Sequence, residues 1–208
     1  MFRFEGVTPR YLSKAVAEDP SFFAQLVIWV FKRNDNGEDA VEELSEDQTK
    51  LRAEIAWELL DALSILPGSE GNDFDENRLN EWIDKARSIL KDAGREDIGD
   101  DKIGAYISRC PVGKDGIWPH EAIRSVIERV RSKCLDDAIN CGKLNSRGVT
   151  SRHPYAGGDQ ERHLAQKYFD DAEAIQLTSP RTASILHSIA KSYKWDAEWE
   201  DRNVELRD

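Results

Sequence analysis

Apolar residues recur three and four positions apart along almost the whole chain, and the strict alternation of a half-buried strand is hard to find. Because an α-helix turns once every 3.6 residues, this spacing places apolar side chains on one face of a helix. The pattern therefore predicts an all-α fold with seven or eight helices. The expected helices span residues 9–18, 20–32, 46–66, 76–93, 100–109, 119–141, 159–177 and 180–204.

Three of these helices have clear start signals, at Thr8-Pro9, Asp19-Pro20 and Ser179-Pro180. In each pair a side-chain oxygen stands where it can accept a hydrogen bond from the first turn. The proline that follows occupies the first helical position, where an N–H is not needed. We expect each of these pairs to begin a helix.

Four helices have apolar stripes that predict their buried faces. For residues 46–66 the stripe consists of Leu51, Ile55, Leu59, Ala62 and Leu63. For residues 76–93 it consists of Leu79, Trp82, Ile83, Ala86, Ile89 and Leu90. For residues 119–141 it consists of Ile123, Ile127, Val130, Cys134, Ala138 and Cys141, and for the last helix of Leu186, Ile189, Tyr193 and Ala197.

Such helices, joined mostly by short loops, form either an irregular bundle or a HEAT-like superhelical stack. No motif recurs at a fixed period, so a regular repeat family is not indicated. We expect residues 1–208 to form a single α-helical domain. A subdomain boundary, if the chain has one, falls in the turn-rich loop at 110–118.

Composition and charge limit the classes of partner. The chain has 208 residues and a net charge of −11, and no apolar run approaches the roughly 20 residues of a bilayer-spanning helix. The amino terminus lacks a secretory signal, and three cysteines without framework spacing are typical of reduced thiols. These features predict a cytoplasmic protein without a membrane role. The acidic charge disfavours nucleic acid, although it does not exclude it.

The segment 143–162 differs from the acidic remainder, because residues 143–158 contain basic side chains and glycines but no carboxylate. Its arginines and free glycine N–H groups, next to a helix start, are typical of a cradle for phosphate or carboxylate. The alternative is that they bond helix ends and neighbouring acids. The candidate ligand-binding residues are Arg147, Gly148, Arg152, His153, Gly157, Gly158 and Arg162.

Other constellations are weaker, and we predict no catalytic residue, metal site or cofactor. The run that starts at Asp73 resembles a calcium loop but has Arg78 at the sixth position and Asp84 at the twelfth, so helix capping by Asp73 or Asp75 is the better interpretation. His163 lies near carboxylates at helical spacing, without a second histidine at ligand spacing. These patterns favour solvated helix surfaces.

Trp195 and Trp199 stand one helical turn apart among acidic residues near the carboxyl end. Tryptophan is usually a core residue, but a pair that projects from a helix surface is typical of a docking site. We therefore expect these two residues to contact another domain or chain.

Three stretches, DGIWPHEAIR, LNSRGVTSRHPYAGGDQER and SPRTASILHSIAKSY, together resemble the carboxyl-terminal helical region of large, uncharacterised bacterial proteins. The resemblance implies a helical fold, a bacterial cytoplasmic setting and a missing amino-terminal portion, and it implies no activity. The sequence thus predicts a non-catalytic interaction or scaffolding module. The alternative is binding of nucleic acid or a phosphorylated ligand through residues 143–162.

Overall fold

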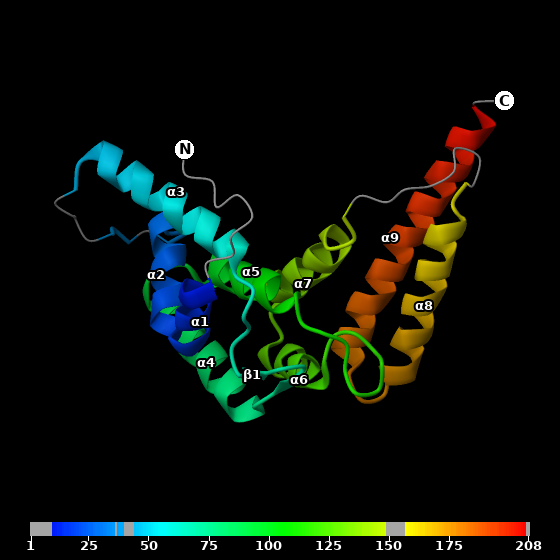
Figure 1. Ribbon diagram of the computed structural model, residues 1–208, viewed down its shortest axis with the longest axis horizontal. Helices are drawn as coiled ribbons and strands as arrows, with labels where there is room; N and C mark the ends of the chain where they lie inside the picture. The colour runs from blue at the N-terminus through cyan, green and yellow to red at the C-terminus, as the bar shows by residue number, and fades with distance from the viewer. Residues whose placement is uncertain (1–9, 36, 40–43, 149–156, 207–208) are drawn as a thin grey trace. The chain divides into compact units, whose positions relative to one another are not determined.

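The computed structural model describes residues 10–35, 37–39, 44–148 and 157–206. Within these ranges the chain is all-α apart from one short hairpin, which confirms the predicted class (Figure 1). Nine helices are present in the described ranges, one more than the upper expectation. The chain divides into two compact units, Met1–Arg109 and Cys110–Asp208.

The first unit contains five helices and the hairpin, as far as it is described. Its elements are α1 (Arg10–Glu18), α2 (Pro20–Val30), α3 (Glu46–Ala62), β1 (Ser69–Glu70), β2 (Asp73–Phe74), α4 (Glu76–Asp92) and α5 (Glu96–Ile107). The strands β1 and β2 pair antiparallel, with Ser69 opposite Phe74. The hairpin is too short to leave an alternating pattern in the sequence, and it was not predicted.

Three aromatic rings form the centre of the first unit. Phe23 of α2 is fully buried, and its ring centroid lies 5.1 Å from that of Trp82 and 5.8 Å from that of Tyr106. The Trp82 indole N–H donates to the carbonyl of Val16 at 3.0 Å, so its one polar group is satisfied. Burial of a side chain such as Phe23 contributes roughly 1.5–3 kcal/mol. Helices α2, α4 and α5 are therefore held together by one aromatic cluster.

The predicted buried face of α3 was partly wrong. Leu59 and Leu63 are buried as expected, whereas Leu51 is 53% exposed and Ile55 is 45% exposed. The buried position in this half of α3 is Ala56, which lies on a different side of the helix. Ala56 is small, so a close approach of α2 and α3 needs this side of α3, and the larger Leu51 and Ile55 stay in solvent.

Helix starts in the first unit follow the predicted signals where they are described. The Asp19 side chain accepts a hydrogen bond from the Ser21 N–H, with Pro20 at the first helical position. Asp75 accepts from the N–H groups of Asn77 and Arg78 and caps α4, as expected. The start predicted at Thr8-Pro9 lies outside the described residues.

Arg95 ties the ends of two helices to the acidic loop that follows α2. Its side chain is buried, and its three nitrogens donate at 2.7 Å to the carbonyl of Phe31, the carbonyl of Ala93 and the carboxylate of Asp39. The carbonyls of Phe31 and Ala93 lie at helix ends that would otherwise lack donors. Part of the acidic loop after α2 therefore neutralises a buried cation.

The second unit contains α6 (Glu121–Val130), α7 (Lys133–Asn145), α8 (Asp159–Ile175) and α9 (Pro180–Glu205). The single helix expected at 119–141 is wrong, because α6 and α7 are separate helices. Arg131 adopts a left-handed backbone conformation with φ of 54°, and the Ser132 side chain then caps α7. The predicted stripe therefore spans two helices, and its last member, Cys141, is exposed.

A buried arginine fixes the loop that enters α6. The Arg124 guanidinium binds both carboxylate oxygens of Asp115, at 2.6 and 2.8 Å. It also donates to the carbonyls of Ile117 and Pro119, each at 2.7 Å. These four hydrogen bonds compensate the charge of the guanidinium. The Arg124 residue can therefore be buried, with only 6% of its surface exposed.

Helix α9 begins without a side-chain cap of its own, although Pro180 occupies its first turn as predicted. The Glu128 carboxylate of α6 takes this role and accepts from the N–H of Thr182 at 2.8 Å and from that of Arg181 at 3.3 Å. A carboxylate is favourable here because the helix dipole is positive at the amino end. Ser179 makes no such bond, so this detail of the prediction was wrong.

None of the described helices combines the length and apolar content that crossing a lipid bilayer requires.

The Asp115–Arg124 pair predicts a pH-dependent contribution to stability. Hydrogen bonds from Arg124 lower the pKa of Asp115 from 3.8 to about 2. Because the pKa is lower in the folded state, the stabilisation is present above about pH 4 and is lost as the pH falls towards 2. We expect Asp115→Asn to lower the free energy of unfolding by about 1 kcal/mol at neutral pH, since the carboxylate is 39% exposed and partly screened.

Urea unfolding at neutral pH and at about pH 3 measures this difference. The deficit of Asp115→Asn shrinks at the lower pH. The control is Asp61→Asn, because the Asp61 side chain is 87% exposed and 3.7 Å from Arg109. If Asp115→Asn lowers the free energy of unfolding by the same amount at both pH values, the ionised Asp115 carboxylate is not the source of the stabilisation.

Candidate functional site

The second unit is built around α9, which contacts α6, α7 and most extensively α8. Its buried residues include Thr182, Ala183, Ile185, Leu186, Ile189, Ala190, Tyr193 and Ala197. The predicted core stripe of this helix is therefore confirmed. The Tyr193 ring stacks on that of Tyr168 in α8, with centroids 5.7 Å apart and planes 8° from parallel. This packing sets which side of α9 remains in solvent.

Gly158 allows the start of α8 to approach the backbone of α9. A β-carbon at Gly158 would overlap the Cα and carbonyl oxygen of Ala197. Only glycine fits at this contact, because the obstructing atoms belong to the backbone and cannot rotate away. The Gly158 N–H donates to the Asp201 carboxylate at 2.9 Å instead of being open to a ligand.

Arg162 completes a clamp between the same two helices. It donates at 2.5 Å to Asp201 of α9 and at 2.5 Å to Asp159 in the first turn of α8. The hydrogen bonds from Gly158 and Arg162 lower the pKa of Asp201. A β-carbon at Gly157 would lie 2.6 Å from the same carboxylate. The two glycines and Arg162 therefore meet at one aspartate.

Arg147 has an internal partner as well. It donates to the Glu161 carboxylate at 2.6 Å, and the Glu161 side chain is 1% exposed. Its guanidinium also lies 5.3 Å from the centre of the Tyr193 ring, within cation–π range. Arg147 thus compensates the charge of a buried acid beside the aromatic core of the unit.

The structure therefore brings together Arg147, Gly157, Gly158 and Arg162 along the α8–α9 pair, each beside a carboxylate of the same unit. Gly148 follows α7 with φ of 65°, and among the described residues that are not its chain neighbours no atom lies within 4 Å of the position a β-carbon would take. Arg152 and His153 lie outside the described residues. The described contacts agree with the alternative in which these side chains bond neighbouring acids.

Trp195 and Trp199 lie on the side of α9 opposite its buried face, and they are 66% and 59% exposed. Leu206, about three turns beyond Trp195 on the same side, is 85% exposed. Arg202 lies between Trp199 and Leu206 on this side of the helix, and its guanidinium is 5.7 Å from the centre of the Trp199 ring. We call Trp195, Trp199, Arg202 and Leu206 the aromatic stripe.

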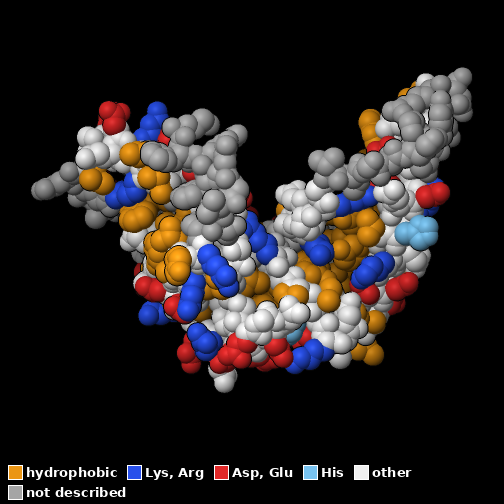
Figure 2. Space-filling view, in the orientation of Figure 1, with side chains coloured by type: hydrophobic (Ala, Val, Ile, Leu, Met, Phe, Trp, Pro, Cys, Tyr) orange, Lys and Arg blue, Asp and Glu red, His pale blue; other side chains and the backbone are white. Residues whose placement is uncertain are grey.

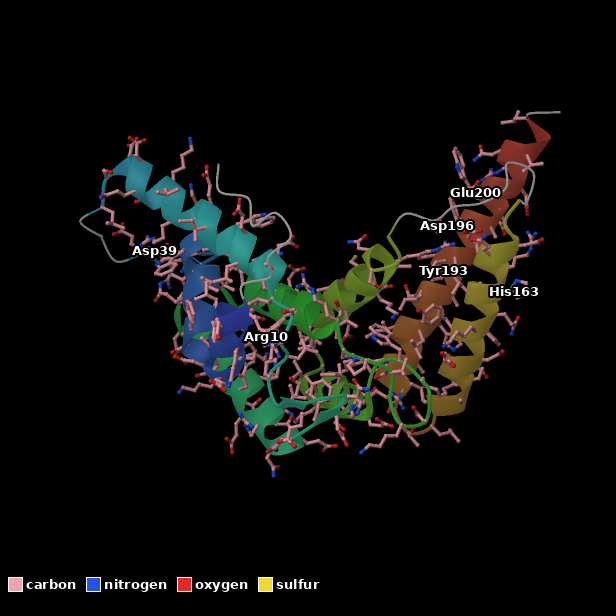
Figure 3. All side chains as sticks on the ribbon, in the orientation of Figure 1. Arg10, Asp39, His163, Tyr193, Asp196 and Glu200 are labelled. Carbon is pink, nitrogen blue, oxygen red and sulfur yellow. The ribbon has the colours of Figure 1, made fainter. Side chains whose placement is uncertain are left out.

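Acidic side chains flank the stripe. Figure 3 shows Asp196 and Glu200 on successive turns of α9 beyond Tyr193, while His163 belongs to α8. Figure 2 shows hydrophobic side chains gathered on the visible face of the α8–α9 pair, with Lys and Arg beside them. Two exposed tryptophans one turn apart on a helix are typical of a binding surface.

A second feature of the same helix pair was missed at the sequence level. A groove of about 540 Å³ lies between α8 and α9. From α8 it is lined by Arg162, Ala165, Gln166 and Phe169. From α9 it is lined by His187, Ala190, Lys191 and Lys194. The signal that could have revealed it is the shared i, i+3, i+4, i+7 spacing of the two sets.

Residues with catalytic chemistry have structural contacts in the second unit. The His120 ring accepts from the Ala122 N–H at 3.2 Å and caps α6. Burial raises the pKa of the Cys110 thiol to about 11, so it is protonated at neutral pH and a poor nucleophile. His163 contacts the carbonyl of Asp159 at 2.8 Å. In the described ranges no three acidic, histidine or cysteine side chains form a group able to hold a metal ion.

Comparison with known proteins found no matching family model, no matching curated protein and no matching solved structure.

The Gly158 contact gives a direct prediction for the helix pair. Gly158→Ala should lower the free energy of unfolding by about 2–3 kcal/mol, because the new β-carbon pushes α8 away from Ala197. Chemical unfolding followed by helix circular dichroism measures the effect. The control, Gln160→Ala, changes an exposed residue of the same turn and should shift stability by a few tenths of a kcal/mol. Equal stability of the two variants would show that the close contact between Gly158 and Ala197 does not contribute to the packing of α8 on α9.

Proposed function

We propose that this chain is a non-catalytic α-helical interaction or scaffolding module that binds another protein through the aromatic stripe of α9. The observation that carries the proposal is the orientation of Trp195 and Trp199. The buried face of α9 is already complete without them, and both rings are more than half exposed. Large aromatic side chains of this kind dominate the binding energy of protein interfaces.

We also propose that the helices form an irregular bundle or a HEAT-like stack in a cytoplasmic bacterial protein. Its partners are other protein domains or chains, and the module is the terminal part of a larger protein. The absence of a fixed repeat favours the irregular bundle, because stacked repeats need equivalent surfaces along the array. The resemblance to bacterial carboxyl-terminal regions supports the setting.

Binding of nucleic acid or a phosphorylated ligand through residues 143–162 remains the alternative proposal. The described contacts support it less. Arg147 and Arg162 each lie within 2.6 Å of a carboxylate, and a phosphate would have to displace those acids. The net charge of −11 adds long-range repulsion for a polyanion.

Site-specific photo-cross-linking tests the proposed docking surface. A benzophenone amino acid at position 195 or 199, in the full chain within its native cells, should give a discrete adduct with another protein. The same probe at Leu177, which is 99% exposed but lies outside the stripe, should not give that adduct. Because both rings are exposed, Trp195→Ala with Trp199→Ala should leave the unfolding free energy within about 0.5 kcal/mol.

The adduct must be lost when the probe at one tryptophan position is combined with alanine at the other. If positions 195 and 199 give no adduct, or give the same adducts as position 177, the stripe is not a docking surface.

A further inference from the structure

The groove between α8 and α9 has the side-chain spacing of a site for a third helix. On α8 the lining residues 162, 165, 166 and 169 follow one another at i, i+3, i+4 and i+7. On α9 the residues 187, 190, 191 and 194 repeat that spacing. Two adjacent helices whose exposed side chains both follow this spacing form a groove into which a third helix can pack.

The floor of the groove is apolar and hollow. Ala165 and Ala190 are small, so the surface is recessed between the larger side chains on either side. Phe169 is 47% exposed, and its ring lies edge-on to that of His187 with centroids 5.3 Å apart. A ligand that fills the recess would cover apolar surface that now faces water, which favours binding.

The rim of the groove is basic, in a chain whose net charge is −11. Among the described residues, its lining contains Arg162, Lys191 and Lys194, and no carboxylate. Arg162 is already held by Asp159 and Asp201, and His187 lies 3.3 Å from Glu173. In contrast, Lys191 and Lys194 form no ion pair with any described residue. The two lysines therefore leave positive charge available to a ligand.

We propose that the α8–α9 groove binds an acidic amphipathic α-helix of a partner protein. The apolar face of that helix lies on Phe169, Ala165 and Ala190, and its carboxylates meet Lys191 and Lys194. The inference rests on the proposed function, and it names the chemistry of the partner. Lys191 stands one turn before Trp195 on α9, so a helix in the groove can extend onto the aromatic stripe.

Charge complementarity favours this occupant over a basic helix and over a nucleic acid. A basic helix would place like charges against both lysines. A nucleic acid would satisfy the lysines but has no apolar stripe to cover Phe169, and it meets the acidic field of the chain. A second copy offers α3, where Leu51 and Ile55 are exposed beside Glu54, so self-association is a separate outcome of the test.

Synthetic helical peptides provide the probe. Both peptides have about 18 residues, roughly five turns, with leucine at the i, i+3, i+4 and i+7 positions. One carries glutamate and the other lysine at every flanking position. We expect the acidic peptide to bind the full chain and to bind more weakly as salt increases, since its charges meet exposed lysines. Fluorescence anisotropy of labelled peptide measures both affinities.

The charge-reversed variant Lys191→Glu with Lys194→Glu should weaken binding of the acidic peptide by about tenfold or more, because attraction becomes repulsion. The matched control is Lys32→Glu with Lys50→Glu, which changes the net charge equally at exposed positions of the first unit. This control should bind the peptide within about twofold of the unmodified chain. Phe169→Ala should also weaken binding, without a change of charge.

Four results would overturn the inference: no binding of the acidic peptide, tighter binding of the basic peptide, equal effects of the two charge-reversed variants, or a dimer of the unmodified chain that the groove variant dissociates. Circular dichroism of each variant confirms that the helices are intact. If positions 195 and 199 give specific adducts but the acidic peptide does not bind, the proposed function stands and only this inference is removed. If there are no specific adducts and the acidic peptide does not bind, the proposed function and this inference are both removed.

Discussion

The close contact of Gly158 with Ala197 is the constraint on which the candidate surfaces depend. It brings the first turn of α8 against the backbone of α9, and the Gly158 and Arg162 bonds to Asp201 hold it there. With Tyr193 and Ala197 turned inward, helical geometry leaves Trp195 and Trp199 in solvent. One backbone approach therefore determines which side chains a partner can meet.

Charged groups inside each unit are matched by internal partners. Arg95 and Arg124 bind loop carboxylates and carbonyls, Glu128 caps α9, and Arg147 compensates Glu161. Such groups stabilise local geometry because leaving one of them unpaired would be costly. The exposed tryptophans and the two lysines of the groove have no comparable role in the described fold. This contrast separates residues that maintain the structure from residues that are available for binding.

Helix class and most helix positions could be predicted from apolar spacing and start signals, because both depend on local sequence. The break at Arg131 could not be predicted, since the apolar stripe runs through it without interruption. The exposure of Leu51 and Ile55 also escaped prediction, because it depends on which side of α3 meets α2. For the candidate site, the sequence isolated Trp195 and Trp199. It did not show that Arg162 meets Asp201, or that Lys191 and Lys194 line a groove with Phe169, because these residues are brought together only by the pairing of α8 with α9.

Hydroxyl-radical footprinting of the isolated chain tests most directly whether α9 presents its aromatic stripe to solvent. The chain contains internal references, since Trp57 is 54% exposed whereas Trp82 and Trp118 are 4% and 2% exposed. The account predicts that Trp195 and Trp199 are oxidised at rates close to that of Trp57 and many times faster than Trp82 and Trp118. Oxidation of Trp195 and Trp199 as slow as that of Trp118 would contradict it.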